Sequence, residues 1–85
     1  ALAWSAGPTP FRETVRLTSP GTGPAQAKIF DLAGRPVRTL VRAGGDAPLE
    51  WDGRDDAGRE APAGVYLVKV ATPAGETSVR VVLTR

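Results

Sequence analysis

The chain has 85 residues, a length that allows one domain with a single modest core. It contains no His, Cys, Met or Asn, which excludes imidazole and thiolate catalysis, zinc and haem sites and disulfides. The net charge of +2 comes from nine Arg and two Lys that alternate with Asp and Glu, so no basic cluster predicts nucleic-acid binding. No apolar run reaches the roughly 20 residues of a transmembrane segment. The missing Met predicts a processed fragment or an excised domain.

Turn-forming residues recur along the chain, which contains 10 Gly and 8 Pro. No window shows apolar residues at the 3.6-residue spacing of an amphipathic helix. This pattern predicts an all-β sandwich or small barrel, and about seven short antiparallel strands favour an immunoglobulin-like β-sandwich. The predicted strands, in chain order, are residues 1–4, 12–18, 25–31, 37–42, 48–51, 65–72 and 77–84.

Alternation of apolar and polar residues indicates which side of each strand is buried. Val15 and Leu17 share one face of their strand, and Ala25, Ala27 and Ile29 share one face of the next. The same reasoning along the chain predicts this core: Val15, Leu17, Ile29, Leu49, Trp51, Tyr66, Val68, Val70, Val79, Val81 and Leu83.

The last two predicted strands form a hairpin whose register depends on the loop length. A four-residue loop, 73–76, sets Val68 opposite Val81 and keeps the apolar residues on one face. The same register sets Lys69 opposite Arg80. Because like charges in opposite positions are mildly destabilising, this pair predicts a carboxylate nearby or an edge where repulsion is useful.

Three segments resemble characteristic blocks of a known family. Residues 29–40 (Ile-Phe-Asp-Leu-Ala-Gly-Arg-Pro-Val-Arg-Thr-Leu) are similar to its "V-Y-D-x-x-G-R-x-V-x-x-L" block, 51–59 to its "W-D-G-x-D-x-x-G" loop, and 62–66 to "P-x-G-x-Y". Residues 8–11 stand where that family carries "P-N-P-F", with Thr9 in place of Asn. The order and spacing resemble the type A C-terminal sorting domain of type IX secretion cargo, and the similar Ig-like domain of the flagellar hook-capping protein.

The resemblance implies an Ig-like domain spanning residues 1–85, the C-terminal module of a larger secreted protein. Its implied role is non-catalytic sorting or anchoring of an extracellular or cell-surface bacterial protein. The implied partners are proteins of the secretion machinery, with a cell-surface polysaccharide as a further attachment point, and no cofactor is expected. The motif residues, for which structural roles are expected, are Asp31, Gly34, Arg35, Trp51, Asp52, Gly53, Asp56, Gly58, Gly64 and Tyr66.

Two of these glycines carry a more specific expectation. Gly34 is predicted to hold a positive φ in a turn between strands, and Gly64 to allow a tight approach before Val65.

The acidic loop is the candidate metal site of the sequence. Asp52, Asp55 and Asp56 could together bind calcium, but an EF-hand start at Asp52 would need Gly at the sixth position, where Ala57 stands. The favoured interpretation is a turn whose Asp side chains accept hydrogen bonds from their own loop amides, with Arg54 and Arg59 balancing the charge. A catalytic carboxylate pair is not expected in so small a chain.

Two further functions remain open from the residues. The chain could be an accessory structural module that packs on a catalytic domain or forms part of a surface fibre, with Leu67 and Val82 in the contact. A weaker alternative is carbohydrate binding through Trp4, because a short terminal strand is predicted to expose it. Trp51 and Tyr66 alternate with apolar residues and are therefore assigned to the core rather than to a sugar-stacking platform.

Overall fold

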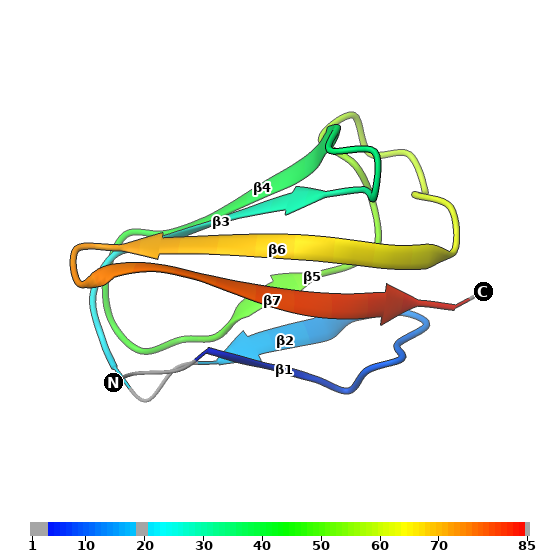
Figure 1. Cartoon of the computed structure of the whole chain (residues 1–85). Helices are drawn as coiled ribbons and strands as arrows, with labels where there is room; N and C mark the ends of the chain where they lie inside the picture. The colour runs from blue at the N-terminus through cyan, green and yellow to red at the C-terminus, as the bar shows by residue number, and fades with distance from the viewer. Residues whose placement is uncertain (1–3, 19–20, 85) are drawn as a thin grey trace.

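The computed structural model describes residues 4–18 and 21–84. Within these residues the chain forms seven strands in two antiparallel sheets, ordered β1-β2-β5 and β4-β3-β6-β7. Figure 1 shows the two sheets facing each other as a sandwich, which confirms the predicted fold class. No helix in the described part of the chain is long and apolar enough to cross a membrane. The strands are β1 Ser5–Gly7, β2 Val15–Thr18, β3 Ala25–Phe30, β4 Pro36–Arg42, β5 Leu49–Trp51, β6 Gly64–Thr72 and β7 Gly75–Leu83.

The core lies between the sheets and is formed by alternate residues of both. All predicted core residues are buried except Val79, which is half-buried and packs against the core from the edge of its sheet. Trp51 occupies the centre, with its ring 5.5 Å from that of Phe11 and 5.0 Å from that of Tyr66. The core also contains buried residues outside the predicted set: Phe11, Ala25, Ala27, Leu40 and Ala61.

The N-terminal part of the chain differs from the prediction. Residues 1–3 of the strand predicted at 1–4 lie outside the described residues; Trp4 is not in a strand, and the first described strand, β1, spans Ser5–Gly7. Ser, Ala and Gly have little intrinsic strand preference, so β1 depends on its pairing with β2. Phe11 then crosses to the other sheet, where its N–H donates to Val82 O at 2.8 Å and its C=O accepts Thr84 N at 2.8 Å. This crossing delays the start of β2 to Val15.

The register of the β6–β7 hairpin also differs from the prediction. The loop is two residues, Pro73 and Ala74, and Val68 pairs with Val79 rather than Val81. The turn is held by the Thr72 hydroxyl, which accepts the Ala74 N–H at 3.2 Å and donates to Gly75 O at 3.3 Å. A shift of two residues leaves every side chain on its predicted face, so the apolar pattern could not distinguish the two registers.

The like-charged pair predicted in this hairpin is therefore wrong. Arg80 lies opposite Leu67 and Lys69 lies opposite Ser78. Lys69 instead faces another lysine, Lys28, on its other side. Its ammonium group lies over the ring of Phe30, 5.5 Å from the ring centroid, which offsets part of this repulsion.

Candidate functional site

The β3–β4 turn is organised by the carboxylate of Asp31. Its Oδ1 accepts the backbone N–H of Ala33 at 2.9 Å and of Arg35 at 3.0 Å, and its Oδ2 accepts Arg35 Nε at 3.1 Å. The backbone hydrogen bond from Arg35, aided by the Arg35 charge, holds the pKa of Asp31 below its usual value. Gly34 has φ +84°, which confirms its predicted turn role. These polar groups are all used within the turn.

The acidic loop after β5 is a pair of similar turns. Asp52 Oδ1 accepts Arg54 N at 3.1 Å, and Asp55 Oδ1 accepts Ala57 N and Arg59 N, both at 2.9 Å. This geometry confirms the interpretation as side-chain-to-backbone turns for Asp52 and Asp55, whereas Asp56 accepts a hydrogen bond from β4 rather than from its own loop.

The charge balance of this loop differs from the prediction. Arg38 of β4 lies between two of the carboxylates, with Nη1 3.3 Å from Asp52 Oδ1 and Nε 3.8 Å from Asp56 Oδ1. Arg54 instead donates to Gly58 O at 2.9 Å. The guanidinium of Arg38 therefore holds the loop against the sheet, a contact between residues that are far apart in the sequence.

Asp56 also covers part of the edge of β4. Its Oδ1 accepts the Thr39 N–H at 3.2 Å, and its own N–H donates to Val37 O at 2.9 Å. The candidate carboxylates are thus all used within the protein: Asp52 and Asp56 share Arg38, and Asp55 bonds to the amides of its own turn. Across residues 4–18 and 21–84, no three acidic side chains are grouped in a way that could hold a metal ion.

Trp51 and Tyr66 attach this loop end to the core. Trp51 is fully buried and its Nε1 donates to Arg54 O at 2.8 Å. The Tyr66 hydroxyl donates to Pro62 O. Gly53, also buried, accepts the Ala61 N–H at 2.8 Å through its carbonyl. Neither ring is available as a platform for a sugar.

Gly64 does not have the predicted role. A Cβ placed on Gly64 would meet no atom within 4 Å, so no tight approach occurs there. Its φ of +155° is the reason for glycine at this position, because L side chains rarely adopt it.

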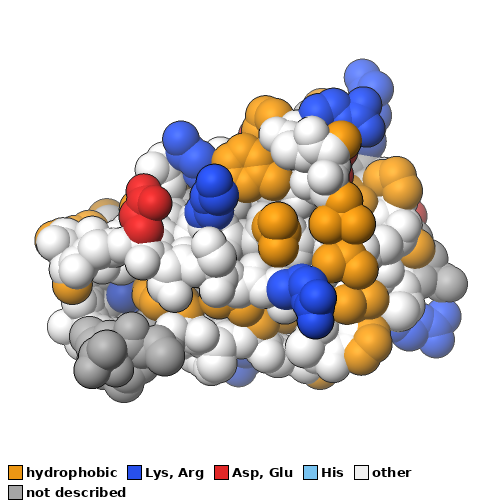
Figure 2. Space-filling view, in the orientation of Figure 1, with side chains coloured by type: hydrophobic (Ala, Val, Ile, Leu, Met, Phe, Trp, Pro, Cys, Tyr) orange, Lys and Arg blue, Asp and Glu red, His pale blue; other side chains and the backbone are white. Residues whose placement is uncertain are grey.

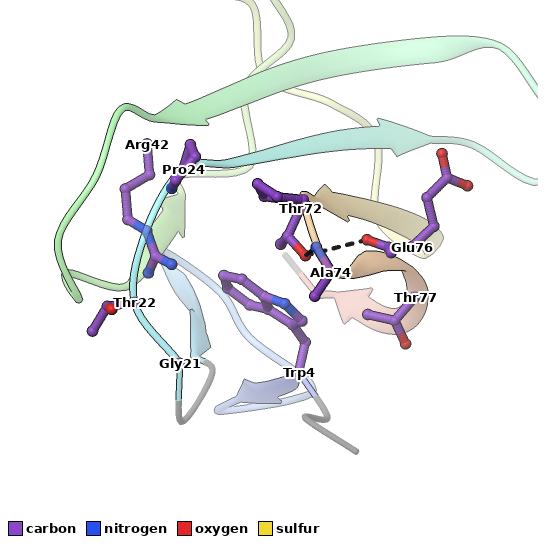
Figure 3. A pocket seen from close by; sticks show the side chains of 11 residues that line it. Trp4, Gly21, Thr22, Pro24, Arg42, Thr72, Ala74, Glu76 and Thr77 are labelled. Atoms are coloured by element: carbon purple, nitrogen blue, oxygen red, sulfur yellow. Dashed lines mark hydrogen bonds between the residues drawn. The ribbon is translucent and has the colours of Figure 1, made fainter.

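A pocket of about 610 Å³ lies at the opposite end of the sandwich, beside the β6–β7 turn. Figure 3 shows Trp4 and Arg42 on its walls together with Thr72, Ala74 and Thr77. Trp4 is half-buried, with the guanidinium of Arg42 over its ring at 5.4 Å. The ring is therefore already stacked on a side chain of the protein, which leaves a poor platform for a sugar.

An apolar patch lies on the outer face of the four-stranded sheet. Its residues, Phe30, Val65, Leu67 and Val82, are neighbours through the β3–β6 and β6–β7 registers, and Leu67 is 38% exposed. Lys69 and Arg80 flank them on the same face. Figure 2 shows this arrangement, with hydrophobic side chains gathered beside Lys and Arg. Alternation within each strand was sufficient to place these residues on the outer face, whereas their grouping into one patch depends on the observed register.

The comparisons with known proteins agree with this architecture. The chain resembles PorZ of Porphyromonas gingivalis, described as an essential surface component of the type-IX secretion system, with a TM-score of 0.75 and 24% identity over 98% of this chain. It also resembles dimeric latent PorU of the same organism, with a TM-score of 0.66 and 23% identity over 99% of this chain. The chain spans 12% of that PorZ chain and 9% of that PorU chain.

No match was found among curated proteins. The sequence model of the FlgD Ig-like domain matches residues 3–80, nearly the whole chain. The chain therefore belongs to the FlgD Ig-like domain family.

Proposed function

We propose that residues 1–85 are a single Ig-like domain, the C-terminal sorting or anchoring module of a secreted or cell-surface bacterial protein. The module does no chemistry of its own. The secretion machinery recognises its folded surface, and a surface polysaccharide is a further attachment point.

The outer-face patch is the observation that carries this proposal. Apolar residues on the outer sheet face, of which Leu67 is exposed and the other three are half-buried, are flanked by Lys69 and Arg80 and are suited to a protein partner, since apolar surface patches mark interaction sites. The carboxylates that suggested chemistry are occupied in turns and ion pairs instead. The likeness to PorZ supports a connection with type IX secretion. The chain covers only 12% of the PorZ chain and 9% of the PorU chain, which supports a module within a longer protein.

A reporter fusion tests the proposal. Residues 1–85 are appended to the C-terminus of a reporter in a bacterium with a working type IX system, and reporter in the medium and on the surface is compared with unfused reporter. Leu67→Glu, in the patch, is expected to reduce export strongly. Val41→Glu is the matched control, because Val41 is 69% exposed and lies outside the patch. Export that is the same with and without the fused domain contradicts the sorting role.

An accessory structural module is the second candidate, and the same patch favours it. An apolar sheet face can pack against a neighbouring domain of the parent protein. In that case Leu67→Glu lowers the thermal stability of the parent protein and leaves the export of the reporter fusion unchanged. Val41→Glu changes neither quantity.

A further inference from the structure

The two edge strands of the four-stranded sheet, β4 and β7, differ in how far their outward backbone groups are hydrogen-bonded. The β4 edge begins at Pro36, and Asp56 occupies the backbone groups of Val37 and Thr39. The β7 edge receives hydrogen bonds from outside its sheet near its end, where Thr9 and Phe11 bond to Val82 and Thr84, and β1 also lies close to β7 without a backbone ladder to it. Uncovered strand edges are templates for pairing with another chain.

The register identifies which backbone groups of β7 lie on its open edge. The N–H and C=O groups of Val82 point away from β6, because they bond to Thr9 and Phe11. Since this direction alternates along a strand, the groups of Glu76, Ser78 and Arg80 point the same way. Among residues 4–18 and 21–84, no hydrogen bond to these outward groups is observed. The β6–β7 register is also continuous from Gly64 to Leu83, so no bulge disrupts this edge.

The side chains on this open stretch are self-complementary. Glu76 and Arg80 are both exposed and lie two residues on either side of Ser78. In an antiparallel pair of two β7 strands centred on Ser78, each Glu76 lies directly opposite the Arg80 of the other copy. Opposite-charge pairs in such positions are stabilising.

We propose that β7 is a homodimerisation edge, at which a second copy of this chain adds antiparallel with Ser78 opposite Ser78. Each outward N–H then meets an outward C=O, and the two four-stranded sheets become one continuous sheet. Thr77 faces Val79 of the second copy on the inner side, which covers the half-buried side chain of Val79. The interface has two-fold symmetry and is therefore closed.

The covered part of the edge sets the extent of this pairing. Val82 is the residue to which Thr9 bonds, and in the proposed register it lies opposite Ala74, the last loop residue before β7 of the second copy. The paired stretch is therefore short, and the contact is smaller than a standard stable interface. A weak dimer that depends on concentration is expected.

Sedimentation velocity of the 85-residue chain, from about 10 µM to about 1 mM, measures this association. The wild-type sedimentation coefficient is expected to rise with concentration. Glu76→Arg gives both pairing positions a positive charge, and Arg80→Glu gives both a negative charge. Each variant alone is expected to raise the dissociation constant about tenfold or more, because attractive pairs become repulsive. Mixed in equal amounts, the two variants restore both opposite-charge pairs and return the dissociation constant to near the wild-type value.

Asp46→Arg and Arg12→Glu make the same changes of net charge at exposed positions outside the proposed contact. They are expected to associate like the wild type. Ser78→Pro removes the central outward N–H without a change of charge and is also expected to abolish association, since proline is tolerated on the solvent side of an edge strand. Circular dichroism and thermal unfolding confirm that each variant is folded.

Three results would overturn the proposal. The wild-type chain could remain monomeric at every concentration, or the mixture of charge variants could fail to associate. Association that survives both charge substitutions would place the contact elsewhere, such as on the outer-face patch. The readout is separate from export, so this proposal and the proposed function can fail independently.

Discussion

The guanidinium of Arg42 lies over the indole ring of Trp4, 5.4 Å from the ring centroid. Arg42 is the one buried charged side chain among the described residues, at 8% exposure. Its Nε donates to Gly23 O at 2.8 Å and its Nη1 donates to Ala47 O at 2.9 Å. The side chain therefore connects the loop after β2, the loop after β4 and the segment before β1.

Arg42→Met is expected to destabilise the fold by about 2 kcal/mol, because two part-buried carbonyl groups lose charged donors. Urea unfolding measures the loss. The substitution also uncovers Trp4, so the fluorescence emission is expected to shift to longer wavelength, while buried Trp51 contributes an unchanged component. Arg12→Met, at an exposed position, is the control. An unfolding midpoint equal to that of the wild type would contradict the role of Arg42.

Tyr66→Phe tests the hydroxyl contact at the loop end. Its ring packs edge-on against Trp51, and phenylalanine retains that packing. The Pro62 carbonyl loses its donor, so the free energy of unfolding is expected to fall by about 1–2 kcal/mol. Chemical unfolding followed by circular dichroism gives the value. If the stability does not change, the hydroxyl contributes nothing to holding the 62–66 segment.

Asp31 predicts a specific pH dependence. The pKa of Asp31 lies below its ordinary value of 3.8, because Arg35 hydrogen-bonds to the charged form. A lowered pKa in the folded state means that the stabilisation is present above 3.8 and is lost as the pH falls through the lowered value. The difference in melting temperature between the wild type and Asp31→Asn is therefore expected to be constant near neutral pH and to shrink below about pH 4. Asp46→Asn, on an exposed loop, is the control, and a difference for Asp31→Asn that does not change with pH would be evidence against the prediction.

The hairpin register can be tested with cysteines, because the chain has none of its own. Lys69 and Ser78 lie directly opposite each other with their side chains on the exposed face. The double variant Lys69→Cys with Ser78→Cys is expected to form a disulfide readily on air oxidation, since directly opposite strand positions have the required Cα separation. Lys69→Cys with Arg80→Cys is the matched comparison and is expected to oxidise far more slowly. The reverse order of rates would support a four-residue loop.

Apolar alternation within each strand was sufficient to identify most of the core, although Phe11, Leu40 and Ala61 were not predicted. A side chain on a strand faces one side or the other according to its position, whichever strand lies beside it. The burial of Leu17, Ile29 and Val68 could therefore be predicted without knowledge of their neighbours. Turn chemistry was local in the same way, because Asp31 and Asp55 bond to amides only a few residues away.

The pairing between strands was harder to predict from the sequence. The β6–β7 loop length changes the partner of Val68 and leaves its face unaltered, so periodicity had no information on the register. β1 lacks strand-forming residues and is held by β2, which is why a strand at Ser5–Gly7 was not predicted. The outer-face patch became recognisable as a contiguous surface once the register had brought Phe30 beside Leu67.

The sequence alone determined an all-β sandwich, the inward face of its strands and the turns at its loop ends, since these depend on interactions between residues close in the chain. The tertiary structure decided the strand partners, the ion pairs of Arg38 with the acidic loop and the burial of Arg42 between two loops. These contacts join residues that only the folded chain brings together, and their geometry depends on the register of whole strands.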